Sequence, residues 1–529
     1  MSGDHETGPR AEGTTEAVPL AIPGGGPPGP RIRARAFAPG EDTSSVLAKG
    51  IGAHPRGLST LFFTEMWERF TYYGIQSILI LFLVAASGRG GLGFTDQNAS
   101  AIWGLYLGGT YLFSLLGGWV ADRLIGGQLA VASGGVLITA GNVLLASGGT
   151  RLFFLGLIFN VLGVGLLKPN VSATVGELYP EGGSRRDAGF SIFYIGINIG
   201  SLIGPMFVPV VAQRYGWHAG FALPALGMLF GVAQFLATRR HLGPAGAARK
   251  TAGPRPWLAL WILVAVICAL TAVMLSGAVT INPVALSARV SWVVGLLMAG
   301  YLLYIAFLGR LSREERGRVL AMLTLFAAST LFWMAYYQTF GSLTLFAQRY
   351  TDLHVFGWNM PAGDMQALPP IFIIVLAPVF AMLWLWLGKR NRDLSSPAKF
   401  AWGLLLIAAG MLVMYVAALR VLHGHNVSPL WLTGAYFLNA CGELCLSPVG
   451  LSSTTKLAPA RFAAQTMGLW FLTLALGGFL AGLLSSGYDA QRLETLPALY
   501  VTLFWWSAGG GIVMLLITPP VKRLMAGVR

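Results

Sequence analysis

Apolar runs long enough to cross a membrane follow one another from residue 58 to near the end of the chain, and short polar loops separate them. About 20 apolar residues in a helix span the hydrocarbon core of a bilayer. We therefore expect an all-α polytopic membrane protein with about fourteen transmembrane helices. The predicted spans are 58–84, 101–121, 129–148, 151–174, 188–212 and 217–238, then 257–278 and 290–309, then 319–348, 368–388, 399–420, 429–454, 465–486 and 496–518.

Lysine and arginine concentrate in alternate loops, which indicates the orientation of the spans. Cytoplasmic loops of membrane proteins are enriched in these residues. The pattern requires an even number of spans, with the 257–309 pair returning to the same side, so we expect both termini in the cytoplasm. The basic side holds Arg185, Arg186, Arg239, Arg240, Arg249, Lys250, Arg310, Arg313, Arg316, Arg318, Lys389, Arg390, Arg392, Lys456, Arg461, Lys522 and Arg523, and the opposite side holds Arg89, Arg214, Arg289, Arg349 and Arg420.

Six spans, a pair and six more spans predict two helix bundles joined by an inserted hairpin. Two halves around a central site are a common plan of transporters. We expect the inserted pair to be peripheral and replaceable because it holds no buried charge. The predicted parts are a disordered cytoplasmic tail (1–56), an N-terminal six-helix bundle (57–240), a linker with the inserted transmembrane hairpin (241–318), a C-terminal six-helix bundle (319–520) and a cytoplasmic tail (521–529).

The composition agrees with this reading. Hydrophobic residues make up 55% of the 529 residues and charged residues only 11%, against about 25% charged in soluble domains. The net charge of +15 reflects basic cytoplasmic loops better than nucleic-acid binding. Cys268, Cys441 and Cys445 lie in apolar runs without metal or redox spacing, so we expect packing roles, no metal and no cofactor.

Three charged residues lie in the middle of the first span, in the segment FFTEMWERFTYYGIQ: Glu65, Glu68 and Arg69. A charge at the centre of a membrane helix costs about 2.5–3.5 kcal/mol on insertion scales, and such residues usually mark a proton, ion or substrate pathway. Glu65 and Arg69 are four residues apart, so they share a helix face and can pair. Tyr72 and Tyr73 continue that face.

Lys168 in the fourth span has no acid nearby on its own helix. The glutamates of the first span are its candidate partners. Protonation of such a glutamate would break the pair and free a helix, which would make the pair a proton switch. Purely structural pairing of these charges is the alternative.

Glu443 stands alone near the middle of the tenth span, with Pro448 weakening the helix five residues further on. An acid opposite Arg69 and Lys168 suggests charge separation across a cavity. Such a cavity would orient a zwitterion, with its amine toward Glu443 and its carboxylate toward Arg69 or Lys168. A protonated, structural glutamate is the alternative.

The first span has the pattern ExxERFxYY, which resembles the first helix of the proton-dependent oligopeptide transporters of the major facilitator superfamily. Further resemblances follow in chain order and cover nearly all of 58–518. They are GGWVADRLIG (117–126) with Asp122 and Arg123, GLLKPNVSATVGELY (165–179) with Lys168, FSIFYIGINIGSLIGP (190–205) with Asn198, LFWMAYYQTFGSLTLFA with Trp333, GELCLSPVGLSSTTKLAP with Glu443, and MGLWFLTLALGGFLAG (467–482) with Trp470.

The resemblance implies the major facilitator fold and a symporter that uses proton influx to import di- and tripeptides by alternating access. It implies a multi-pass protein of the inner (plasma) membrane, with protons, a small peptide and the lipid bilayer as partners and a monomeric functional unit. It assigns proton coupling to Glu65, Glu68, Arg69 and Lys168, a gating loop to Asp122 and Arg123, and peptide contacts to Arg69, Tyr72, Tyr73, Tyr111, Lys168, Asn198, Trp333, Glu443 and Trp470. For the aromatic residues a packing or interfacial role is the more common one in membrane proteins, and Asn198 could equally join two helices.

Three positions depart from the family pattern. Gln76 stands where the family often has Arg, Tyr337 where the seventh helix usually has an acid, and Pro369 where the eighth helix has Asn. Glu443 is then the single deep ionisable residue expected in the C-terminal half. A smaller, more apolar peptide or a non-peptide solute is therefore an alternative substrate, with a different proton stoichiometry.

Other classes fit the sequence less well. The apolar spans contain no HExxH, no acid pair with histidine and no Walker-type loop, so we do not expect an enzyme. A peptide-binding sensor without transport would not need the charged set. Within transport, a proton-coupled carrier of a non-peptide small solute is the alternative.

Overall fold

The computed structural model describes residues 54–180, 183–248, 253–279, 281–355, 357–390, 392, 394–487 and 492–526. The predicted tail over 1–56 lies outside the described residues except for its last three, and Arg249 and Lys250 of the basic linker also lie outside them.

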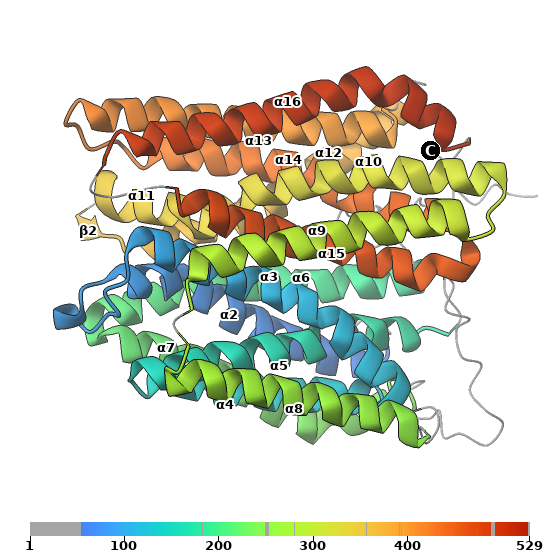
Figure 1. The fold of residues 1–529 in the computed structure, drawn as a ribbon, viewed down its shortest axis with the longest axis horizontal. Helices are drawn as coiled ribbons and strands as arrows, with labels where there is room; N and C mark the ends of the chain where they lie inside the picture. Colours follow the sequence, from blue (N-terminus) through green and yellow to red (C-terminus); the bar gives the residue numbers. More distant parts are fainter. Residues whose placement is uncertain are drawn as a thin grey trace, which may run out of the picture.

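Two bundles of membrane-length helices lie side by side, the N-terminal one below and the C-terminal one above in Figure 1. Between them in the sequence come α8 (Pro254–Ser276) and α9 (Pro283–Leu308). The predicted fold class, two six-helix bundles with an inserted hairpin, is confirmed. The N-terminal bundle contains α2 (Arg56–Val84), α3 (Asp96–Val120), α4 (Gly127–Ala146), α5 (Thr150–Glu177), α6 (Gly183–Tyr215) and α7 (Trp217–Thr238). The C-terminal bundle contains α10 (Arg313–Tyr336) with its continuation α11 (Ser342–Tyr350), α12 (Leu368–Lys389), α13 (Ser396–Leu422), α14 (Leu430–Leu457), α15 (Ala463–Ser485) and α16 (Thr495–Leu524).

Within the described ranges, twelve helical segments are long and apolar enough to span a membrane. The helices α2, with 29 residues, and α14, with 28 residues, are also long enough to span a membrane, but they fall outside this set because they are more polar. They carry charges that the sequence singles out, the buried Glu65, Glu68 and Arg69 in α2 and the half-buried Glu443 in α14. With these two helices the structure has the expected fourteen spans.

Two helices begin several residues before their predicted apolar spans, because capping residues stabilise an earlier start. The Thr95 side chain accepts a hydrogen bond from the Asn98 backbone, so α3 begins at Asp96. Asn282 caps α9 in the same way, with Pro283 as its first residue. Polar capping side chains satisfy backbone N–H groups that a hydropathy pattern does not detect.

The seventh span, predicted over 319–348, is one helical segment of membrane length with a break in its α-helical hydrogen bonding. The α-helix α10 ends at Tyr336 and is followed by a 3₁₀ turn, η5 (Tyr337–Phe340), before α11 begins at Ser342. Gly341 separates the two parts, and a Cβ there would lie 2.9 Å from the Trp103 ring of α3. The break therefore lets the seventh span approach the N-terminal bundle closely.

The two bundles are in close contact along α3 and α15. A Cβ on Gly104 of α3 would lie 2.6 Å from the Cα of Gly482 of α15, and the reverse holds for Gly482. Gly108 and Gly478 are in similar contact further along the same helices. Small residues allow backbones in a membrane to approach and pack by dispersion forces.

One end of the molecule, which we call the Asp96 end, holds the start of α3, α11 and a short antiparallel hairpin, β1 (His354–Val355) with β2 (Trp358–Asn359). Polar contacts join the bundles here. Arg349 of α11 pairs with Asp96, and Gln366 donates to the carbonyl of Gln76 at 3.4 Å. Gln366 belongs to the 3₁₀ turn η6 (Ala362–Ala367), whose Gly363 also packs on α2 and α6. The structure is thus closed at the Asp96 end, while the start of α2 and the end of α16 lie at the opposite end (Figure 1).

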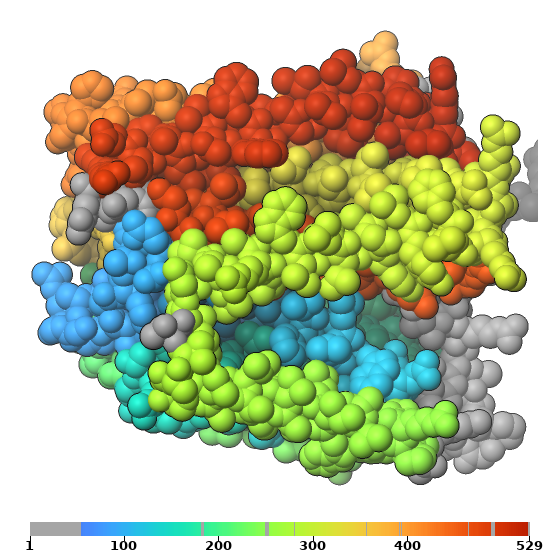
Figure 2. All heavy atoms as spheres, in the orientation of Figure 1, coloured from blue at the N-terminus to red at the C-terminus, as the bar shows by residue number. Residues whose placement is uncertain are grey.

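Only one of the two helices of the inserted hairpin is peripheral. No described residue of α8 is buried, as expected. In contrast, α9 buries one stripe against α15, α10 and α3, and the Ser287 hydroxyl donates to the Phe479 carbonyl of α15 at 3.3 Å. Figure 2 shows the hairpin crossing the front of the molecule, with α8 on the N-terminal half and α9 beside the C-terminal half. The expected peripheral position thus holds for α8 and not for α9, and the replaceability of the pair stays a prediction.

Candidate functional site

Arg69 lies between two carboxyl groups inside α2. Its Nε is 3.2 Å from Oε1 of Glu65, and it also contacts the carboxylate of Glu68. All three side chains are buried, and the predicted pairing of Glu65 with Arg69 is present. Among the described residues, Oε2 of Glu65 and Oε1 of Glu68 have no hydrogen-bond partner. Each carboxyl group therefore keeps one oxygen that can take a proton without losing an existing hydrogen bond.

Aromatic rings surround this cluster. The Arg69 guanidinium lies 5.1 Å from the Tyr72 ring centroid, a cation–π distance. Tyr73 packs edge-on against Tyr72, and Tyr106 of α3 lies within electrostatic reach of Glu68. These contacts place the charged residues in a water-poor environment, where electrostatic interactions are stronger than in solution.

Lys168 of α5 lies on an aromatic ring and does not form the predicted ion pair in this conformation. Its Nζ is 4.0 Å from the Tyr111 ring centroid and 5.9 Å from that of Tyr72. Glu65 is within electrostatic reach, but no ion pair of Lys168 occurs among the described residues. Both glutamates of α2 contact Arg69 in this conformation. A cation–π contact is weak enough for an incoming anion to displace it.

Glu443 of α14 faces the N-terminal bundle. Its carboxyl group interacts with Tyr336 of α10, and Tyr73 of α2 and Tyr194 of α6 lie within its electrostatic reach. The side chain is half-buried, and its Oε2 has no hydrogen-bond partner among the described residues. An acid on one bundle thus lies opposite Arg69 and Lys168 on the other, as the charge-separation hypothesis requires.

Two further predicted contact residues lie beside the tyrosines near Glu443. Trp333 of α10 stacks on Tyr337, and its indole Nε1 has no hydrogen-bond partner among the described residues. Asn198 of α6 donates to the carbonyl of Tyr194 one turn earlier, at 2.9 Å. The Asn198 amide is therefore used within its own helix here.

The structure separates the other predicted residues from the charged groups. Trp470 is buried inside the C-terminal bundle, where its ring contacts Phe326 and Phe400. Asp122 and Arg123 are exposed in a π-helical turn, η3 (Ala121–Ile125), between α3 and α4. Trp470 thus has a packing role in this conformation, and the Asp122–Arg123 loop lies apart from the charged groups.

The structure shows where each of the three residues that depart from the family pattern lies. The Gln76 side chain accepts a hydrogen bond from the Trp103 indole at 2.9 Å, which joins α2 to α3 within the N-terminal bundle. Pro369 lies at the start of α12, where a missing N–H costs little. Tyr337 lies in the broken seventh span and stacks on Tyr111.

Sequence reasoning missed two tyrosines of the site and one ion pair at the Asp96 end. Tyr194 lies four residues before Asn198, so helical spacing could have indicated it. Tyr336 is adjacent to Tyr337, which already stands out in the sequence as a departure from the family pattern. The ion pair of Arg349 with Asp96 joins residues 253 positions apart, and nothing local in the sequence indicates it.

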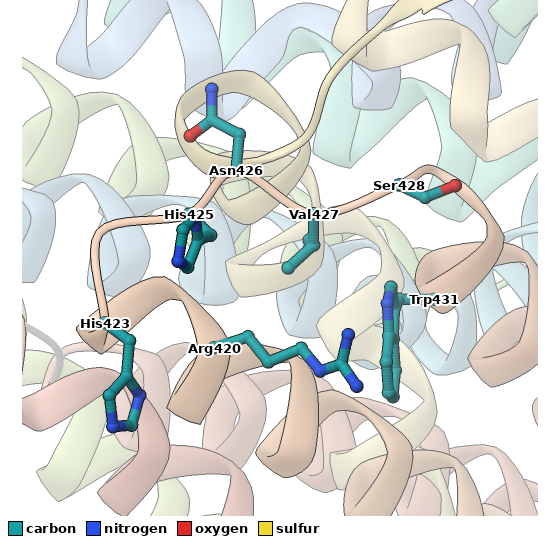
Figure 3. Close-up of a pocket in the computed structure, with 7 residues that line it drawn as sticks. All are labelled: Arg420, His423, His425, Asn426, Val427, Ser428 and Trp431. Carbon is teal, nitrogen blue, oxygen red and sulfur yellow. The ribbon is translucent and has the colours of Figure 1, made fainter.

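A separate pocket of about 410 Å³ lies on the loop between α13 and α14. In Figure 3 the Arg420 side chain extends beneath Val427 toward the Trp431 ring, whose centroid is 5.1 Å from the guanidinium. All the lining residues belong to the C-terminal bundle and its loop, so the pocket is not part of the interbundle site. They are Arg420, His423, His425, Asn426, Val427, Ser428 and Trp431.

Sequence comparisons identify relatives over most of the chain. The sequence profile of the POT family matches residues 128–498. The peptide transporter YePEPT of Yersinia enterocolitica is 40% identical over 487 residues, which cover 89% of this chain and 95% of that protein. The di-/tripeptide transporter of Lactococcus lactis is 37% identical over 433 residues, covering 79% of this chain and 86% of that protein.

Solved structures have the same architecture. A crystal structure of a variant of a peptide transporter POT in complex with alafosfalin has a TM-score of 0.85 and 41% identity, and the match covers 92% of this chain and 99% of that one. A POT family transporter in complex with 5-aminolevulinic acid has a TM-score of 0.83 and 32% identity, covering 90% and 99%. Because the family profile spans well over half of the sequence and the relatives align over most of their length, this chain belongs to the POT family.

Proposed function

We propose that the protein is a proton-coupled symporter that imports di- and tripeptides, or similar small zwitterions, by alternating access. The carrying observation is the arrangement of buried charge: Arg69 between two acids on one bundle, Lys168 beside it without an acid partner among the described residues, and Glu443 on the other bundle. The family membership and the names of the relatives, which are peptide and di-/tripeptide transporters, support the substrate class.

In this proposal Glu65 and Glu68 carry the coupled proton. Each has a buried carboxyl oxygen without a hydrogen-bond partner among the described residues, and each contacts Arg69. Protonation of one acid removes its negative charge and releases part of the Arg69 guanidinium. Arg69 and Lys168 can then attract the substrate carboxylate more strongly, so proton and substrate bind together.

Substrate recognition follows from the charge separation. The carboxylate of a peptide binds near Lys168 and Arg69, and its amine binds Glu443. Tyr72, Tyr73, Tyr111, Asn198 and Trp333 line the space between, with Tyr194 and Tyr336 added by the geometry. A relative that is 32% identical has been solved with 5-aminolevulinic acid, a small molecule with an amine and a carboxylate.

We further propose that the Asp96 end faces the outside of an inner (plasma) membrane and that both termini are cytoplasmic. The basic loops of the opposite end support this orientation through the positive-inside rule. The closed Asp96 end then makes this conformation an inward-facing one, and the functional unit is a single chain.

Uptake of a labelled dipeptide into proteoliposomes tests the proposed function. An inward-directed proton gradient should drive accumulation above the external concentration, and a protonophore should abolish it. An imposed potential of 100 mV adds about 2.3 kcal/mol per proton moved. No uptake across a dipeptide library, together with gradient-driven uptake of another solute, would reject the peptide assignment.

A further inference from the structure

Four side chains stack in a column that crosses from one bundle to the other. The ammonium of Lys168 lies 4.0 Å from the ring centroid of Tyr111. The rings of Tyr111 and Tyr337 are stacked with centroids 6.2 Å apart and planes at 29°. Tyr337 stacks in turn on Trp333, at 5.3 Å and 28°. Lys168 and Tyr111 belong to the N-terminal bundle, and Tyr337 and Trp333 belong to the C-terminal bundle.

Among the described residues, the Tyr111–Tyr337 contact joins α3 to the broken seventh span, and two other contacts join the same elements. Nearest the Asp96 end, Asp96 pairs with Arg349. Next, Trp103 packs on Gly341. Tyr111 and Tyr337 form the deepest contact, and Tyr337 has only 3% of its surface exposed.

Opening of the Asp96 end has to separate all three contacts, because each joins the same two elements. The outer two contacts lie away from the charged groups of the site. The third contact includes a charged group of the site, because the Lys168 ammonium lies over the Tyr111 ring. A cation held on a ring also restricts how that ring can turn.

We propose that Tyr337 is a positioning residue that forms the inner contact of the gate at the Asp96 end and couples this gate to Lys168 through Tyr111. While Lys168 rests on Tyr111, the stack favours the closed gate. When a substrate carboxylate draws Lys168 away, Tyr111 is freed and the gate is weakened. The substrate step rests on the proposed function, whereas the gate and its dependence on Lys168 do not.

The experiment measures the opening of the Asp96 end directly. Spin labels are placed on the full chain at Ser87→Cys, just after α2, and Ser428→Cys, just before α14, with Cys268, Cys441 and Cys445 replaced by serine. Both label sites are exposed and lie on different bundles. Pulsed dipolar spectroscopy without substrate then reports the ratio of open to closed gates. Loss of one stacked aromatic pair corresponds to about a 2- to 10-fold change in such a ratio.

Tyr337→Leu should increase the open population by about this factor, and Tyr337→Phe, which keeps the stack, should restore the original distance distribution. Tyr301→Leu is the matched control, because Tyr301 stacks on Tyr304 within α9, away from the gate. Lys168→Met should also open the gate, but it should have no further effect in the Tyr337→Leu background.

The inference is overturned if Tyr337→Leu leaves the distances unchanged, if Tyr337→Phe opens the gate as much as leucine does, or if Lys168→Met and Tyr337→Leu act additively. These measurements need no transported substrate. A failure of peptide uptake would thus reject the proposed function without affecting the proposed gate. Unchanged distances in Tyr337→Leu would reject the gate without affecting the proposed function.

Discussion

Arg349 and Asp96 form a two-pronged ion pair between the bundles, with Nη1 2.6 Å from Oδ2 and Nη2 2.7 Å from Oδ1. Parallel hydrogen bonds of a guanidinium to a carboxylate are geometrically demanding, so the pair defines one relative position of α3 and α11. Asp96 is also the first residue of α3, where a negative charge stabilises the helix N-terminus. The ion pair therefore fixes the closed state of the Asp96 end.

Replacement Arg349→Gln should destabilise the closed state by about 1–3 kcal/mol, because it leaves the buried Asp96 carboxylate without its cation. The spin-label distance across the Asp96 end should shift toward the open form. The matched control is Arg318→Gln, which removes a looser and more exposed ion pair with Glu314 at 3.9 Å. Equal effects of the two replacements would contradict the role of the Arg349–Asp96 pair.

Replacement Glu68→Gln should abolish accumulation of peptide against its gradient, because the amide cannot carry the coupled proton. Exchange of peptide across the membrane without net proton movement should persist. Counterflow and gradient-driven uptake are measured in the same proteoliposomes. Accumulation at the wild-type level would exclude Glu68 from the coupling mechanism.

Replacement Glu443→Gln should weaken binding of substrates with a free amino group. Loss of a buried charge partner costs about 2 kcal/mol or more, which corresponds to roughly a 30-fold increase in KM. Glu314→Gln serves as the control, because Glu314 is exposed at the start of α10. If N-acetylated and free dipeptides lose affinity equally in Glu443→Gln, the amine-binding role is wrong.

Replacement Gly482→Ala should destabilise the protein, because the new methyl group would meet the α3 backbone 2.6 Å away. Overpacking of this kind costs about 1–3 kcal/mol. Gly509→Ala in α16 is the control, since its Cβ would have no neighbour within 4 Å. Thermal unfolding in detergent should show a lower midpoint for Gly482→Ala and no loss for Gly509→Ala. Equal midpoints would mean that the α3–α15 contact is looser than the structure shows.

The sequence predicted the span pattern and the charged residues well, because both depend on local rules. A run of apolar residues identifies a membrane helix, and a charge within it stands out, as Glu65 and Glu443 do. The spacing of Glu65 and Arg69 also predicted their pairing. Predicting these features does not require knowing which helices are in contact.

Features that depend on contacts between distant segments could not be predicted. Lys168 lies on Tyr111 while Arg69 contacts both glutamates, and this arrangement of three helices is visible only in three dimensions. Gly341 packs on Trp103, which is far away in the sequence, and nothing local indicates this contact. Similarly, Trp470 has the residue type of a binding-site aromatic but packs inside its own bundle.

The central claim is that peptide and proton move together through the site around Arg69. The most direct test loads proteoliposomes with a pH-sensitive dye and adds an external dipeptide without any initial pH gradient. We predict that the lumen acidifies as the dipeptide enters through the wild-type protein and that Glu68→Gln abolishes the acidification. Dipeptide entry without acidification, or acidification that survives in Glu68→Gln, would contradict the account.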